Sequence, residues 1–119
     1  MTALLFVLCH STDDPDRAVT GLHAAVAAVR NGDDVALWLT GEGVRLGIEG
    51  VAETLNEDIP ESAAEMLATL VEGGAVLCLD RFSFQRRGYS EDAVREGAAV
   101  ADPKRLGELL AAGRHAVTL

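Results

Sequence analysis

The chain has 119 residues, and 49% of them are apolar, which suits one domain with a buried core and no need for stabilising disulfides. Its formal net charge of −9 disfavours nucleic acid and anionic membrane surfaces as partners. From this length we expect a single domain over residues 1–119. The two cysteines form neither a disulfide scaffold nor a paired-cysteine metal motif, so we expect reduced thiols and a cytoplasmic protein.

Apolar runs typical of strands alternate with helical patterns, as in repeated βαβ units. Residues 3–8 are continuously apolar, which predicts a parallel strand covered on both faces, and the run is too short to span a membrane. Asp13-Asp14-Pro15 is expected to open a helix, with a carboxylate as its cap, and the helix is expected to end at residues 31–32. A second strand is predicted over residues 35–39, with a short helix after Gly43.

The second half of the chain continues this alternation. Residues 53–60 are polar and predict an exposed loop, and a helix from about Pro60 to Glu72 leads to a third strand over residues 75–79. Residues 80–89 are expected to form a loop or a distorted turn, and residues 90–95 a short helix. The remaining predicted elements are a strand at 98–100, a helix opened by Asp102-Pro103 with Leu106, Leu109 and Leu110 facing inward, and a last strand at 115–119.

Cys78 is the first candidate for chemistry, because ligands of open parallel sheets bind beyond the carboxyl ends of the strands. Arg81, Arg86 and Arg87 follow it closely, and nearby cations favour the nucleophilic thiolate over the thiol. The alternative is that Cys78 is a small buried core residue, a common use of cysteine.

Cys9 and His10 end the first predicted strand. If the first and third strands are neighbours, Cys9 can approach the thiol of the third strand as a redox pair, or contribute to a metal site with His10. The alternative is a core cysteine beside a histidine that satisfies a turn. Asp14, Thr40 and Gly41 are the other residues expected around a crevice at the strand ends.

Residues 40–43 contain a G-x-G pattern. A dinucleotide fingerprint needs a third glycine, and Leu46 occupies that position, so we expect no organic cofactor here. The three histidines are scattered along the chain, so we expect no metal ion either. Three of the five Phe, Tyr and Trp residues, Phe82, Phe84 and Tyr89, gather near the arginines. Aromatic and arginine side chains together are common in subunit interfaces, which is the use we expect, although these rings can also tuck back onto the sheet.

The order of motifs carries a family resemblance. A D-x-x-[RK]-A helix entry at 14–18 is followed by a second strand that runs into residues 39–44. A third strand with a cysteine precedes Arg87-Gly88, and Glu96-Gly97 comes before a leucine-rich helix and a terminal strand. From about Leu4 to Leu119 this chain resembles the DsrE/DsrF-like family, which includes YchN-like and TusD-like proteins.

The resemblance implies a three-layer α/β/α fold with a mainly parallel sheet of about five strands, assembled as a homo-trimer or homo-hexamer. It also implies a sulfur relay in which Cys78 accepts sulfane sulfur as a persulfide and passes it to a partner protein. Counted back from Arg87-Gly88, Ser83 stands instead where some members carry cysteine. The alternative function is a non-catalytic oligomer that binds a small ligand or a partner protein in the crevice at the strand ends.

Overall fold

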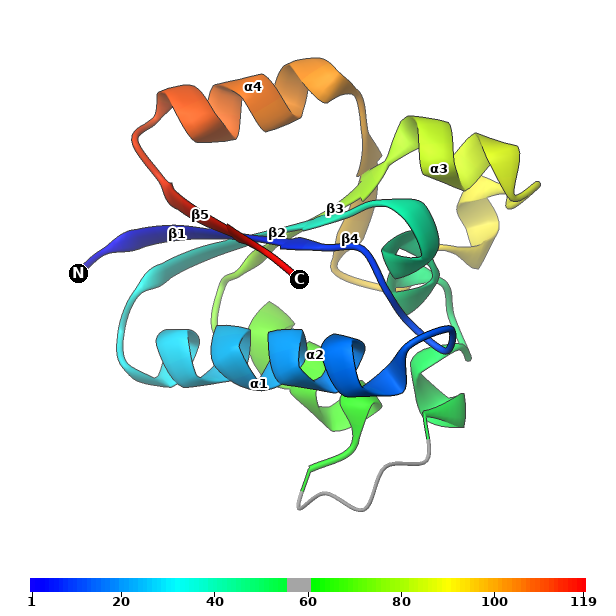
Figure 1. The fold of residues 1–119 in the computed structure, drawn as a ribbon, viewed down its shortest axis with the longest axis horizontal. Helices are drawn as coiled ribbons and strands as arrows, with labels where there is room; N and C mark the ends of the chain where they lie inside the picture. The colour runs from blue at the N-terminus through cyan, green and yellow to red at the C-terminus, as the bar shows by residue number, and fades with distance from the viewer. Residues whose placement is uncertain (56–60) are drawn as a thin grey trace.

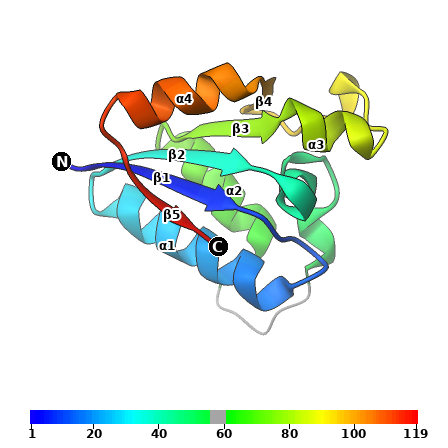
Figure 2. The ribbon, with the colours of Figure 1, turned by 45° about the horizontal axis from the view of Figure 1, so that its top comes forward.

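The computed structural model describes residues 1–55 and 61–119, and a single parallel sheet forms its centre. The strand order is β4-β3-β2-β1-β5, and each neighbouring pair is parallel. The arrows of β1, β2, β3 and β5 can be followed in Figure 2. The strands are β1 (Ala3–Leu8), β2 (Asp34–Leu39), β3 (Val76–Asp80), β4 (Ala98–Ala101) and β5 (His115–Thr118).

Two helices cover one face of the sheet (Figure 1). Helix α1 (Pro15–Arg30) starts where the Asp14 carboxylate accepts a hydrogen bond from the Arg17 amide, and Ser62 caps α2 (Ala63–Glu72) in the same way. Helix α4 (Pro103–Ala111) lies alone on the opposite face. The predicted α/β class and three-layer arrangement are therefore confirmed.

Most of the core lies between the sheet and α1 and α2. Leu22, Val26, Leu67 and Leu70 are almost fully buried there, as the helical spacing predicts. Met66 of α2 is fully buried as well.

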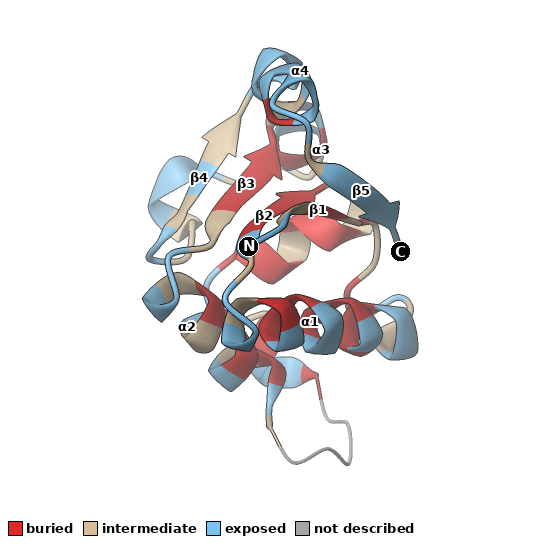
Figure 3. Cartoon of the chain, turned by 90° about the vertical axis from the view of Figure 1, so that its left-hand side faces the viewer, coloured by how far each residue is buried: buried red, intermediate tan, exposed pale blue. Residues whose placement is uncertain are grey.

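The face beneath α4 has a much smaller core. Its buried members are Leu5, Ala36, Trp38, Cys78 and Leu109. Figure 3 shows the contrast: buried residues fill the central strands and the inner sides of α1 and α2, whereas α4 and β5 are largely exposed.

Within residues 1–55 and 61–119, three short 3-10 helices complete the path: η1 (Gly41–Gly47), η2 (Ala52–Thr54) and η3 (Glu91–Ala93). The predicted loop at 53–60 is therefore partly helical at its start, and residues 56–60 lie outside the described residues, as does the first residue of the helix predicted from Pro60.

Two further expectations are wrong. Residues 80–89 were expected to form a loop or a distorted turn, but Arg81–Arg86 forms helix α3, because the Asp80 side chain accepts a hydrogen bond from the Ser83 amide and caps it. Leu110 was expected to face inward and is 47% exposed, since a helix that lies alone on its face buries only a narrow stripe around Leu109.

Candidate functional site

A buried polar network joins the carboxyl ends of β2 and β3. Oδ2 of Asp80 accepts hydrogen bonds from Ser83 Oγ at 2.7 Å, from the Ser83 amide at 3.1 Å and from Thr40 Oγ1 at 3.3 Å. Ser83 Oγ in turn accepts a hydrogen bond from the Gly41 amide at 2.8 Å. Asp80 and Ser83 are both buried, so the network fixes the two strand ends against each other.

The two glycines after β2, Gly41 and Gly43, allow backbone geometry that other residues would not. Gly41 has φ +55°, a left-handed conformation, and its amide points at Ser83. Gly43 passes so close to β1 that an added Cβ would lie 1.9 Å from the carbonyl oxygen of Leu8. The G-x-G pattern is thus explained by a tight turn and a close backbone approach.

The loop after β1 carries the other predicted crevice residues. Nδ1 of His10 lies 2.7 Å from Oδ2 of Asp13, and Asp13 also accepts a hydrogen bond from the Ser11 amide. The Asp14 carboxylate caps α1, so its role in this structure is to begin that helix. Within the described residues, no group of three or more His, Cys, Asp or Glu side chains is placed to hold a metal ion.

The two cysteines are not neighbours. Strand β2 lies between β1 and β3, so the backbones of the two cysteine-bearing segments are two strand spacings apart, about 9–10 Å. A disulfide requires Cα atoms within about 7 Å. The idea of a Cys9–Cys78 redox pair, which assumed adjacent strands, is therefore wrong for this fold.

Cys78 lies in the middle of β3, with Trp38 beside it on one side and Ala99 on the other. Its side chain belongs to the small core beneath α4, and the residue is 4% exposed. Burial raises the pKa of the Cys78 thiol, while the guanidinium of Arg105 on α4 acts in the opposite direction. The expectation of a lowered pKa is not met, because desolvation outweighs the nearby cation.

Two of the three predicted arginines pair with groups other than the Cys78 thiol. Arg81 pairs with Asp102 at 2.6 Å and with Glu91 at 3.6 Å. Arg87 donates to Glu42 at 2.8 Å and to the carbonyl oxygen of Ser83 at 3.1 Å.

Arg86 is exposed at the end of α3. The structure therefore brings Arg87 to the strand-end network and places Arg105, which the sequence did not single out, near the Cys78 thiol.

A groove of about 620 Å³ runs along β3 and β4 on the side of α4. We call it the α4-side groove. Its wall and floor are small or aliphatic, and Arg105 alone is charged among the described residues that line it. The lining residues are Ala75, Val76, Leu77, Cys78, Gly97, Ala98, Ala99, Val100, Ala101 and Arg105.

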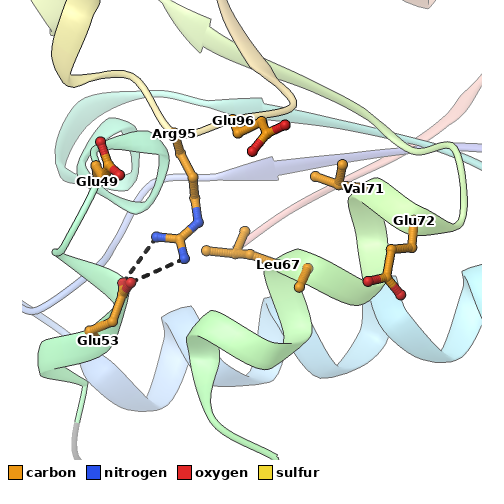
Figure 4. A pocket seen from close by; sticks show the side chains of 8 residues that line it. Glu49, Glu53, Leu67, Val71, Glu72, Arg95 and Glu96 are labelled. Atoms are coloured by element: carbon orange, nitrogen blue, oxygen red, sulfur yellow. Dashed lines mark hydrogen bonds and ion pairs between the residues drawn. The ribbon is translucent and has the colours of Figure 1, made fainter.

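A second hollow, of about 340 Å³, lies between α2 and the segment that precedes β4 (Figure 4). Four glutamates and Arg95 surround an apolar wall formed by Leu67 and Val71. Arg95 forms a two-pronged ion pair with Glu53, at 3.0 and 3.3 Å, which ties this segment to η2 and lowers the pKa of Glu53. This hollow is organised around an internal ion pair.

The three aromatic residues near the arginines differ in burial. Phe84 is 3% exposed, and its ring centroid lies 6.1 Å from that of Tyr89, so both tuck back onto the main core. Phe82 is 68% exposed and stays available for a subunit contact.

The comparisons with known proteins agree with this fold. The model of the DsrE/DsrF-like family matches residues 2–119. The chain belongs to that family. Its fold is similar to the ychN protein from E. coli, with 17% identity and a TM-score of 0.85, and to MTH1491 from Methanobacterium thermoautotrophicum, a protein of unknown function, with 14% identity and a TM-score of 0.74.

Both similarities cover 100% of this chain and 100% of the other, so this family member has the fold of the complete solved chains. No curated protein is significantly similar to it in sequence. Across the described parts of the chain, none of the helices has the length and apolar character needed to cross a membrane.

Proposed function

We propose that this DsrE/DsrF-like protein is a non-catalytic, homo-oligomeric binding protein, and that the α4-side groove receives a small anionic ligand with an apolar part. The observation that carries the proposal is the composition of the groove. Small apolar residues line it, and Arg105 supplies its one charge, in a chain whose net charge is −9. A volume of about 620 Å³ falls within the range of small-molecule sites.

Arg105 gives the groove its selectivity. Its guanidinium can form two parallel hydrogen bonds to a carboxylate, sulfonate or phosphate, and the aliphatic residues of β3 and β4 receive the apolar part. The acidic surface repels anions elsewhere, so an anion gains most where this cation meets an apolar wall.

The test is an NMR titration with 1-hexanesulfonate, which combines an anionic head with an apolar tail. Amide shifts are expected at Cys78, Ala99 and Ala101. Arg105→Gln should weaken binding by about 10- to 150-fold, because a charge-assisted hydrogen bond contributes about 1.5–3 kcal/mol. Arg86→Gln is the matched control and should bind like the parent. Shifts outside the groove, or equal binding by Arg105→Gln, would refute the proposal.

A persulfide relay through Cys78 is the second candidate, favoured by the presence of that thiol in the groove lining beside Arg105. In the transfer, the Cys78 thiolate attacks the terminal sulfur of a donor persulfide. A new S–S bond forms at Cys78 as the donor's S–S bond breaks, and the donor leaves as a thiolate.

Glutathione persulfide is the probe for this second function, in a Cys9→Ser background. Gain of one sulfur atom by the native protein, absent in Cys78→Ser, would support the relay. An unchanged mass after a long incubation would leave binding as the function of the groove.

A further inference from the structure

Strand β4, which lines the α4-side groove, is an edge strand of the sheet. Its sequence lacks the residues that usually prevent an edge strand from pairing with another strand. Strand β4 is paired with β3 on one side only, and its four residues, Ala98–Ala101, contain no charge and no proline. Exposed edge strands normally carry such residues, because their free backbone groups recruit strands of other chains. We propose that β4 pairs with β4 of a second copy in an antiparallel arrangement about a twofold axis.

Hollows on both sides of β4 leave room for the partner strand. The α4-side groove follows one side of β4. Another hollow, of about 260 Å³ and distinct from the one around Arg95, follows the other side and is lined by Glu91, Val94 and residues 98–100. Alternate side chains of an added strand point to opposite faces of a sheet, so each set finds an unfilled space.

The register follows from the alternation of the strand. Residues directly opposite each other in an antiparallel pair point to the same face, so a twofold axis must pass beside one residue of β4. With the axis at Val100, this residue faces its own copy, and Ala99 faces Ala101 of the second copy. Ala99 and Ala101 lie on the face of Cys78 and Asp80, so only small side chains meet in the groove.

Charge complementarity favours a second copy in the antiparallel direction as the partner. Glu96 precedes β4, and Lys104, the one lysine in the chain, follows it. An antiparallel pair brings the beginning of one β4 beside the end of the other, so Glu96 of one copy comes near Lys104 in the first turn of α4 of the second copy. Two complementary pairs therefore form, one at each end of the shared strands.

The pairing also changes the groove. Strand β4 forms the outer part of its lining, so the second copy supplies a wall beyond Ala99 and Ala101. The two grooves become one trough with an Arg105 from each copy. A ligand site that is shallow in one chain is thus completed by the partner, but the pairing itself does not require that the ligand proposal be correct.

The experiment compares the two edges of the sheet. Ala99 on β4 and Ala116 on β5 are both exposed edge alanines on the α4 side, because Ala116 is opposite Leu5 and Ala99 is opposite Cys78. Light scattering should show that Ala99→Lys halves the subunit number of the parent, whereas Ala116→Lys leaves it unchanged. An unchanged number in Ala99→Lys, or a halved number in Ala116→Lys alone, would overturn the proposal.

A crosslink checks the register even if a lysine variant fails to fold. In a Cys9→Ser background, Val100→Cys should form a disulfide-linked dimer under mild oxidation, and Val117→Cys on β5 should not. Equal crosslinking of both variants, or none in Val100→Cys, would contradict the antiparallel pairing. Because neither readout involves a ligand, failure of the groove to bind hexanesulfonate leaves this result interpretable.

Discussion

The two faces of the sheet differ in how they are covered. Helices α1 and α2 cover one face and bury most of the core, whereas α4 alone covers the other and buries Leu109 over a small cluster. The first face therefore supplies stability. The second face holds the α4-side groove, which Cys78 and Arg105 both line. Because this face contributes less to stability, its residues can differ between proteins that share the fold but not the function.

The largest single loss of stability is expected from a leucine truncation in the main core, compared with the same truncation on the other face. Leu22→Ala should lower the free energy of unfolding by about 4 kcal/mol, because Leu22 is 0% exposed in the main core. Leu109→Ala should cost only about 2 kcal/mol, since its surroundings are thin enough to relax. Urea denaturation measures both values, and a larger cost for Leu109→Ala would reverse the assignment of the stabilising face.

Glycine-to-alanine substitutions sharpen the comparison further. Gly43→Ala should cost about 3 kcal/mol or more, because the new Cβ would lie 1.9 Å from the Leu8 carbonyl oxygen, and backbone must move. Gly107→Ala in α4 meets nothing within 4 Å and should be neutral or stabilise by up to about 1 kcal/mol. Thermal unfolding distinguishes the two, and equal effects would contradict the close approach at Gly43.

The strand-end network joins the carboxyl ends of β2 and β3. Ser83→Ala should cost about 1–2 kcal/mol, because the Gly41 amide loses its acceptor and Asp80 loses a buried donor. Ser90→Ala, at an exposed position, is the control and should stay within about 0.5 kcal/mol of the parent. Chemical denaturation measures both, and a neutral Ser83→Ala would show that water replaces the network.

The smallest effect is the pH dependence of the Arg95–Glu53 ion pair. Arg95 lowers the pKa of Glu53 in the folded state, so its contribution is present above the unfolded value of 4.5 and disappears as pH falls through the folded value. Glu53 is half exposed, which limits the effect to about 0.2–1 kcal/mol. Glu53→Gln should therefore destabilise at pH 7 but match the parent at pH 3, and a difference that persists at pH 3 would exclude this cause.

Much of the fold could be predicted because hydrophobic periodicity is local. The apolar runs around Leu5, Leu37 and Leu77 and the stripe through Leu22 needed no knowledge of distant contacts. Helix α3 was missed because its start depends on a single cap by Asp80, within a segment whose arginines and aromatics show no helical stripe.

The site was harder to predict because it is assembled from distant segments. Cys78 and Arg105 belong to different elements, and only the path of α4 over β3 and β4 brings them together. Strand alternation left open whether Cys78 faces solvent or core, since both faces of a parallel strand are covered. The order of strands, which separates Cys9 from Cys78, was likewise invisible in the local pattern.

The rate of Cys78 alkylation against pH, followed by mass spectrometry in a Cys9→Ser background, tests the central claim most directly. A thiol that is 4% exposed and has a raised pKa should label slowly in the native state, with an apparent pKa above the usual value of about 8.5. That result supports a groove that binds without covalent chemistry. Fast labelling with an apparent pKa well below that value would contradict it and establish Cys78 as a poised sulfur acceptor.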